Sequence, residues 1–148
     1  MSQEKWDKRF FGLCNLVASW SEDESRKIGS VIVGPDNEIR SIGFNGLPRK
    51  VINKFERNER PLKYSFFEHS ERNAIYNAGR VGIPLNGCKI YCNLFPCSDC
   101  ARAIIQSGIV ELNTYPFEEN DRFIESFKNA IDMLNESDIN IRLHCALS

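Results

Sequence analysis

The chain has 148 residues, of which 42% are hydrophobic, and its 19 basic and 20 acidic side chains give a net charge of −1. This length and apolar share suit one soluble domain over 1–148, and the lack of any run of 18 apolar residues excludes a membrane-spanning helix. The balanced charge excludes a protein that coats nucleic acid through an excess of basic residues. The N-terminus is polar and carries acidic residues, unlike a signal peptide, so we expect a cytoplasmic protein.

The first half of the sequence predicts a helix, a hairpin and a long loop. Apolar residues at steps of three and four predict an amphipathic helix over 5–19. Strands over 28–33 and 39–44 flank a Gly-Pro-Asp-Asn turn segment, so they should pair as a hairpin. Residues 45–65 are polar, basic and interrupted by two prolines, which predicts a long loop of the kind that is usually functional or mobile.

The second half alternates helices and strands. We expect helices over 69–77, stopped by Gly79, over 97–106 and over 123–134. The expected strands cover 89–94, 110–115 and 139–144. This alternation after the opening hairpin predicts an α/β fold with a mixed sheet and helices on both of its faces.

Six cysteines need a role, because a chain without a secretory signal is not expected to form disulfides. They are Cys14, Cys88, Cys92, Cys97, Cys100 and Cys145. Cys88 and Cys92 are four residues apart on or beside a predicted strand and should fill the core. Cys14 and Cys145 lie on apolar patterns, so we expect them to be packing residues as well.

The remaining two cysteines belong to a motif that carries chemistry. An H-x-E segment at 69–71 is followed, after 24 residues, by P-C-x-x-C at 96–100. This pattern is the signature of the zinc-dependent nucleobase deaminases. Catalytic zinc takes three protein ligands from imidazole and thiolate groups, and the segments offer His69, Cys97 and Cys100. Glu71 would then lie beside a zinc-bound water without binding the metal, which assigns it proton transfer.

Other interpretations of the cysteines stay open. A C-x-x-C pair alone is also typical of redox sites and of structural zinc sites. A closed structural site is a further possibility, formed by Cys88, Cys92, Cys97 and Cys100. The presence of Glu71 argues against a zinc-stabilised interaction module, because a structural site needs no general base. His144, at the end of the last predicted strand, is expected to be an ordinary surface or core histidine.

Four segments extend the similarity: GFNGLP at 43–48, HSERNAI at 69–75, LFPCSDCA at 94–101 and IIQSGI at 104–109. With these segments in this order, the chain resembles the deoxycytidylate (dCMP) deaminases over roughly residues 6–145. The resemblance implies a cytidine-deaminase-like three-layer α/β/α sandwich with a five-stranded mixed sheet. It also implies a catalytic Zn²⁺ ion, hydrolytic deamination of dCMP to dUMP for thymidylate synthesis, and a homo-oligomer, commonly a hexamer.

The resemblance also implies substrate-binding residues. Asn45 would hydrogen-bond the deoxyribose, and the backbone near Ser70 would contact the base. Arg26 or Lys27 would bind the phosphate, and Tyr115 is expected to close over the pocket. The plain alternatives are an ordinary Asn-Gly turn at Asn45 and solvated basic side chains at 26 and 27.

Many relatives respond to dCTP and dTTP at a separate site, and here the sequence departs from the family pattern. Arg49 and Lys50 stand where a glycine-containing continuation is usual, and Arg72 stands where an apolar residue is common. Effector binding is therefore a hypothesis, with Arg49, Lys50 and Arg80 as phosphate ligands and Mg²⁺ accompanying a triphosphate. A solvated loop of balanced charge is the alternative.

Rival activities also stay open. The enzyme could act on another cytosine nucleotide such as dCTP, or on a base in tRNA or single-stranded DNA. The net charge of −1 and the Gly-Phe-Asn-Gly segment argue against the nucleic-acid substrates. We therefore expect a nucleotide substrate and neither a nucleic acid nor a membrane as partner.

Overall fold

The centre of the fold is a five-stranded mixed sheet. In the computed structural model, which describes residues 2–145, β1 (Gly29–Val33) pairs antiparallel with both β2 (Ile39–Phe44) and β3 (Lys89–Cys92). Strand β4 (Glu111–Thr114) joins β3 in parallel, and β5 (Asn140–Leu143) joins β4 in parallel. The order across the sheet is β2-β1-β3-β4-β5, and the predicted opening hairpin is confirmed.

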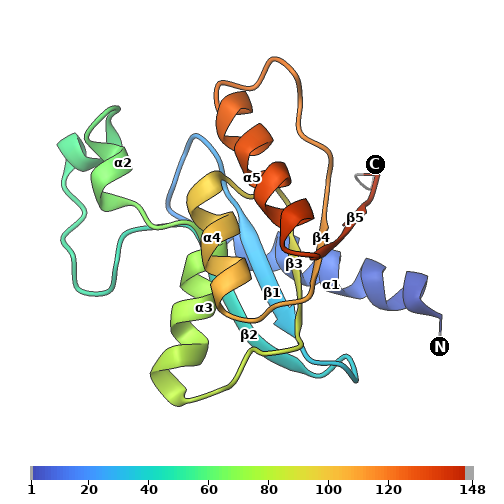
Figure 1. The fold of residues 1–148 in the computed structure, drawn as a ribbon. Helices are drawn as coiled ribbons and strands as arrows, with labels where there is room; N and C mark the ends of the chain where they lie inside the picture. The colour runs from blue at the N-terminus through green and yellow to red at the C-terminus, as the bar shows by residue number, and fades with distance from the viewer. Residues whose placement is uncertain (1, 146–148) are drawn as a thin grey trace.

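Helices cover both faces of this sheet (Figure 1). Helix α1 (Gln3–Ala18) packs on one face, and α3 (Ser70–Val81), α4 (Ser98–Gln106) and α5 (Ile124–Glu136) pack on the other. The predicted three-layer sandwich is therefore confirmed. Among residues 2–145, no helix has both the length and the apolar character to cross a bilayer. A single domain over 1–148 stays a prediction, and residues 1 and 146–148 lie outside the described part.

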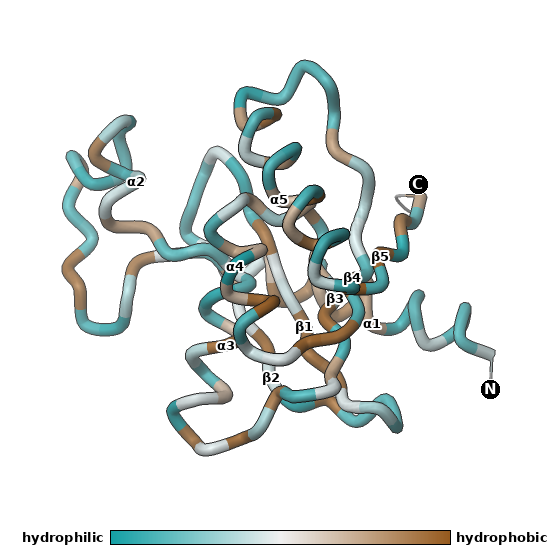
Figure 2. The backbone as a smooth tube through the Cα atoms, viewed as in Figure 1, coloured by the Kyte–Doolittle hydropathy of each residue, from teal (hydrophilic) through white to brown (hydrophobic). Residues whose placement is uncertain are grey.

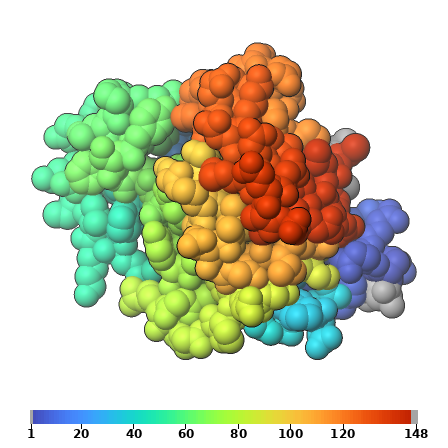
Figure 3. Space-filling model, viewed as in Figure 1, coloured from blue at the N-terminus to red at the C-terminus, as the bar shows by residue number. Residues whose placement is uncertain are grey.

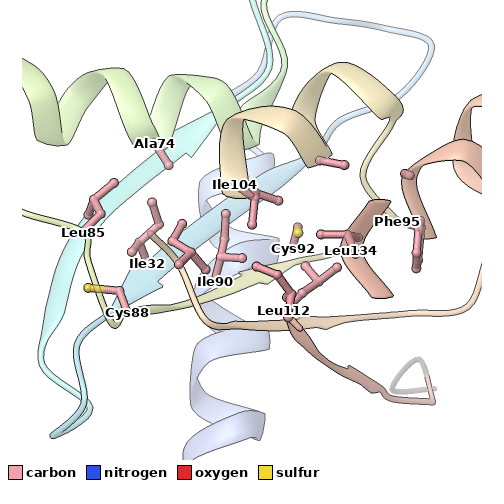
Figure 4. Packing of buried hydrophobic residues seen from close by; sticks show 14 of the residues in the cluster. Ile32, Ala74, Leu85, Cys88, Ile90, Cys92, Phe95, Ile104, Leu112 and Leu134 are labelled. Atoms are coloured by element: carbon pink, nitrogen blue, oxygen red, sulfur yellow. The ribbon is translucent and has the colours of Figure 1, made fainter. Parts of the chain in front are cut away.

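The alternation of strand side chains divides the core in two. Ile32, Ile90 and Leu112 point toward α3, α4 and α5, as Figure 4 shows, whereas Val31 and Tyr91 pack against α1. All five residues of β1 are buried, which explains the apolar run Val31-Ile32-Val33 at its end. Figure 2 shows apolar residues concentrated in the central strands, whereas the long connection between β2 and α3 is mostly polar with scattered apolar residues.

Two sequence predictions about element boundaries need correction. Helix α3 continues past Gly79 and ends at Gly82, whose φ of 76° is the left-handed conformation that glycine adopts without strain. Gly79 is simply a tolerated glycine inside the last turns of the helix. The predicted long loop contains two short helices, η1 (Phe55–Asn58) and α2 (Lys63–Phe66).

The cysteines outside the motif lie mostly where the sequence predicts. Cys14 is fully buried between α1 and the sheet, and Cys88 and Cys92 are fully buried on the opposite face. Cys145 is exposed, so the prediction that it is a packing residue is wrong. Strand β5 ends before it, at the edge of the sheet, where the apolar pattern no longer faces a core.

A buried carboxylate ties α1 to the far edge of the sheet. Asp7 accepts a hydrogen bond from Tyr91 Oη at 2.6 Å and pairs with Arg142 Nη2 at 2.7 Å. Arg142 also donates to Asn113 Oδ1 at 2.8 Å, so one guanidinium connects α1, β4 and β5. Burial opposes ionisation, but hydrogen bonds from Arg142, Tyr91 and Gln3 hold the pKa of Asp7 below its ordinary value.

Replacing Asp7 by Asn should lower the free energy of unfolding at pH 7 by about 2–3 kcal/mol, because hydrogen bonds to a charged partner are lost. The pKa of Asp7 is lower in the folded than in the unfolded chain. Its stabilisation is therefore present above about pH 4 and is lost as the pH falls through the folded value. Urea unfolding at pH 7 and pH 3 should show the difference from wild type shrinking at pH 3.

The matched control is Asp132→Asn, because this carboxylate is exposed on α5. Its free energy of unfolding should stay within about 0.5 kcal/mol of wild type at both pH values. Equal losses in the two variants would show that the Asp7 contacts do not stabilise the fold.

Candidate active site

Three side chains of metal-binding type meet where α3 and α4 begin. His69 is the N-cap of α3, Cys97 is the N-cap of α4, and Cys100 lies in the first turn of α4. His69 Nδ1 is 3.3 Å from Cys97 Sγ and 3.4 Å from Cys100 Sγ, and all three ligand atoms lie within 4.8 Å of one another. Ligand atoms around a tetrahedral zinc ion lie about 3.5–3.8 Å apart, so the group fits zinc closely.

The packing of α3 against β2 fixes where that helix begins. A Cβ atom on Gly43 would lie 2.5 Å from the backbone oxygen of Ser70 and would also meet the backbone of Ala74. Only glycine permits this approach, which gives Gly43 of the Gly-Phe-Asn-Gly segment a physical role. Asn73 Nδ2 donates to the Phe44 carbonyl at 2.8 Å and holds the same contact.

The two helix N-termini favour negative charge on the sulfur atoms. Their free N–H groups and dipoles stabilise anions, and Cys100 N–H donates to Cys97 Sγ at 3.4 Å. Hydrogen bonds from Cys100 and His69 lower the pKa of Cys97 to about 4. The hydrogen bond with Cys97 raises the pKa of His69, and Cys97 together with burial raises the pKa of the Cys100 thiol. Cys97 is therefore the thiol that ionises first.

The competing Cys₄ interpretation is wrong in this fold. Within residues 2–145, one group of three or more metal-binding side chains comes together, and it contains His69, Cys97 and Cys100. Cys88 and Cys92 lie in the apolar core instead. His144 contacts Asn113 Oδ1 at 2.9 Å and packs on Phe11 on the α1 side of the sheet, as expected of an ordinary histidine.

Glu71 lies in the first turn of α3 beside the metal-binding group and is 4% exposed. Together with His69 and Cys97 it lines a cavity of about 270 Å³. The opposite walls of the cavity are aromatic, formed by Tyr64, Phe67, Phe95, Phe123 and Phe127. A carboxylate, metal-binding side chains and apolar walls thus share one cavity, the usual composition of a small-molecule site.

The long connection between β2 and α3 supplies part of the outer wall. Its base is closed by backbone hydrogen bonds between Gly46 and Glu68, at 2.7 and 3.0 Å. Its α2 helix brings Tyr64 edge-on against Phe123, with ring centroids 5.9 Å apart. Figure 3 shows this segment, in green, meeting the orange segment before α5. The connection therefore belongs to the site.

Comparison with known proteins agrees with this geometry. Residues 4–115 match the profile of the cytidine and deoxycytidylate deaminase zinc-binding region. The chain belongs to this deaminase family.

Relatives extend over most of this deaminase chain. The uncharacterized deaminase in the luxG 3′ region of Aliivibrio fischeri is 40% identical over 93% of this chain and 92% of its own length. Mouse deoxycytidylate deaminase is 36% identical over 73% of this chain, which spans 63% of the mouse protein. The dCMP deaminase of cyanophage S-TIM5, crystallised with dCMP and dUMP, shares the fold with a TM-score of 0.79 at 21% identity, covering 97% of this chain and 99% of that one.

Asn45 lines the deaminase cavity but uses most of its amide internally. Its Oδ1 accepts from the Ile28 N–H at 2.9 Å, and its Nδ2 donates to the Arg26 carbonyl at 2.8 Å and to Asp23 Oδ2 at 3.3 Å. The side chain thus fastens the 23–28 segment to the end of β2. One lone pair of Oδ1 is left for a ligand, so the predicted sugar contact stays a prediction.

The other predicted substrate residues are only partly brought together. Arg26 lines the cavity and pairs with Asp121 Oδ2 at 2.9 Å, whereas Lys27 is exposed and does not line it. Tyr115 stacks on Phe11 on the α1 side of the sheet, with ring centroids 4.8 Å apart. This position contradicts the expectation that Tyr115 closes over the pocket, because the side chain following β4 points to the opposite face.

Sequence reasoning missed two cations that line the cavity. Lys63 is buried and binds Asp23 Oδ1 at 2.7 Å, and Arg122 lies over the ring of Phe123 at 4.9 Å. Lys63 begins the four-residue helix α2 and Arg122 lies in the turn before α5, and both segments are too short for periodicity to show which way a side chain points. The pairing of aromatic and basic residues in Lys63-Tyr64 and Arg122-Phe123 is the one available signal.

A second surface cavity, of about 460 Å³, lies beside the deaminase site. Arg49 and Arg80 line it together with Phe44 and Tyr76, and Arg49 Nη2 donates to Asn77 Oδ1 at 2.6 Å. The structure therefore brings together two of the three residues predicted to bind an effector. The third, residue 50, is exposed and does not line this cavity.

Wild-type protein purified without chelators should contain about one zinc ion per chain, and His69→Ala or Cys97→Ala should lose it. Cys88→Ala is the matched control, because it removes a thiol that the structure places in the core. Elemental analysis by mass spectrometry measures the zinc content. Loss of zinc from the Cys88 variant, or its retention by the His69 variant, would restore the Cys₄ interpretation.

Proposed function

We propose that the protein is a zinc-dependent enzyme that hydrolyses dCMP to dUMP and ammonia. The observation that carries this proposal is the buried carboxylate of Glu71 beside the His69, Cys97 and Cys100 group in one cavity. Deoxycytidylate deaminases among the relatives support dCMP as the substrate. A cyanophage enzyme of the same fold was crystallised with dCMP and dUMP, which supports the same substrate and product.

The reaction needs water to replace the amino group at C4 of cytosine, with one proton moved to N3 and another to the leaving nitrogen. His69, Cys97 and Cys100 would hold a zinc ion, which would supply Lewis-acid activation of water near neutral pH. Glu71 is the residue that carries the protons: it takes one from the attacking water and delivers it to N3. It then takes the second from the new C4 hydroxyl and delivers it to the amino nitrogen, so that ammonia leaves as the C4–N bond breaks and the C4 carbonyl forms. The position of Glu71 in the wall of the same cavity as His69 and Cys97 supports this role.

The cavity walls support recognition of a nucleotide. Phe67 and Phe123 offer apolar surfaces for the pyrimidine ring, and Asn45 Oδ1 offers an acceptor for a sugar hydroxyl. Arg26 and Arg122 are the cations proposed to bind the 5′-phosphate. Among the described residues Arg122 makes no ion pair, so its charge is available to a substrate without breaking an internal contact.

The decisive experiment is an assay of dCMP, dCTP, CMP and deoxycytidine, followed by loss of cytosine absorbance. We expect kcat/KM to be highest for dCMP and to fall by about 10²-fold or more for deoxycytidine, which lacks the charge-assisted phosphate contacts. The Glu71→Gln variant tests the proton carrier. It should retain zinc but lose about 10²–10⁴-fold in kcat, because general acid–base transfer is removed. A preference for dCTP, or near-normal turnover by the Gln variant, would overturn the assignment.

Effector control is a finer proposal that rests on the second cavity. Arg49 and Arg80 present two cations beside the exposed ring of Tyr76, which suits the phosphates and base of a nucleoside triphosphate carrying Mg²⁺. Glu68 links the two sites, because it lines both cavities and binds Arg72 at 2.6 Å. We propose that dCTP and dTTP act there. The hexamer and the cytoplasmic location stay predictions.

Addition of dCTP with Mg²⁺ at sub-saturating dCMP should raise the initial rate by about fivefold or more, the range of a typical coupling free energy. Arg80→Ala should abolish the response and keep the rate without effector. Lys50→Ala is the matched control, since that side chain does not line the cavity, and it should respond like wild type. Initial rates that stay constant across the dCTP titration would reject effector control.

A further inference from the structure

Two buried serines lie directly behind the carboxylate of Glu71. Ser70 is the first residue of α3 and Ser30 is the second residue of β1, and both are 0% exposed. Ser70 Oγ is 2.5 Å from Glu71 Oε1, and Ser30 Oγ is 2.7 Å from Ser70 Oγ and 3.4 Å from Glu71 Oε1. The three side chains therefore form one hydrogen-bonded unit that joins the sheet to the helix.

The number of available protons fixes the direction of these hydrogen bonds. Each hydroxyl has one hydrogen to donate, and a carboxylate can only accept. The short contact assigns the Ser70 hydrogen to Glu71 Oε1, so Ser30 donates to Ser70 Oγ. The order is thus Ser30 to Ser70 to Glu71, and each donor strengthens the next.

Packing alone does not explain these hydroxyls. The other side chains of β1 are valines and an isoleucine, and Ser30 stands among them as a buried polar group. A buried hydroxyl is costly unless it is hydrogen-bonded, and the shortest contact of the Ser30 hydroxyl to another hydroxyl or carboxylate is the one to Ser70. Both hydroxyls approach the same carboxylate oxygen, Oε1. Neither serine engages Oε2, which is left for proton transfer.

We propose that Ser70, itself oriented by Ser30, is a positioning residue that holds the Glu71 carboxylate with Oε2 toward the reacting atoms. This inference rests on the proposed function of Glu71 as the proton carrier. It gives the Ser70 side chain a role distinct from base recognition by the backbone. It also makes the register of β1 part of the catalytic geometry, because a one-residue shift would turn Ser30 to the α1 face.

The test compares Ser70→Ala, Ser30→Ala and the double variant in steady-state assays with dCMP. For Ser70→Ala we expect kcat to fall about tenfold, the loss for one hydrogen bond to a charged group, with KM within about twofold and zinc content unchanged. Ser30→Ala should lose about threefold in kcat, because it acts through Ser70. The double variant should match Ser70→Ala alone, since coupled residues are not additive.

A matched control is Ser41→Ala. Ser41 is also a buried strand serine, and its Oγ donates to the Ala74 carbonyl of α3 at 2.6 Å, away from Glu71. Its loss should lower thermal stability as much as the loss of Ser70 does, but should leave kcat unchanged. A crystal structure of zinc-loaded Ser70→Ala should show the Glu71 carboxylate rotated from its wild-type position, a readout independent of turnover.

The experiments distinguish a failure of the proposed function from a failure of the positioning role of Ser70. Absence of dCMP turnover in wild type, or near-normal turnover by Glu71→Gln, would reject the proposed function itself. An active wild type with unchanged kcat in Ser70→Ala, or equal kcat losses in Ser70→Ala and Ser41→Ala, would reject the positioning role alone. Ser70→Thr keeps the hydroxyl. A retained kcat in this variant, together with a reduced kcat in Ser70→Ala, would support the positioning role.

Discussion

The convergence of two helix N-termini at one point above the sheet is the constraint on which the site depends. Helices α3 and α4 both begin where His69 and Cys97 serve as N-caps, so free N–H groups and positive dipole ends surround the same space. Such a place stabilises thiolates and a carboxylate that would otherwise repel one another. The close approach at Gly43 and the parallel pairing of β3 with β4 hold the two helices in this relation.

The outer part of the site has a different origin. The segment over 47–67 leaves the sheet at Gly46, returns at Glu68, and has little apolar interior of its own. It is held at the cavity by Lys63 on Asp23 and by Tyr64 on Phe123. The rigid sandwich therefore supplies the reacting groups, while irregular segments supply most of the walls that select a substrate. Enzyme folds commonly divide the two tasks in this way.

The sequence alone predicts the sandwich and its reacting groups well, but it predicts the loops that form the walls poorly. The hairpin, the mixed sheet and the ligands His69, Cys97 and Cys100 are predictable, because periodicity and motif spacing are local signals. The end of α3 is not predictable in the same way, because both Gly79 and Gly82 could stop a helix. The exposure of Cys145 is not predictable either, because the local apolar pattern does not show where the core ends. Lys63 and Arg122 escape prediction because their direction depends on tertiary contacts between distant loops. The resemblance places Tyr115 over the pocket, whereas the alternation of side chains from Leu112 carries it to the α1 face.

The serines behind Glu71 show how a polar group can connect fold and chemistry. Ser70 looks like a conservative variation on a common alanine, and in the sequence nothing relates it to Ser30, which lies 40 positions earlier. In the fold, the second residue of β1 faces α3 because strand side chains alternate, and α3 begins directly above it. The carboxylate is thus tied through two hydroxyls to β1, whose five residues are all buried. A group that must move protons between fixed atoms gains from such an anchor, because small displacements cost rate.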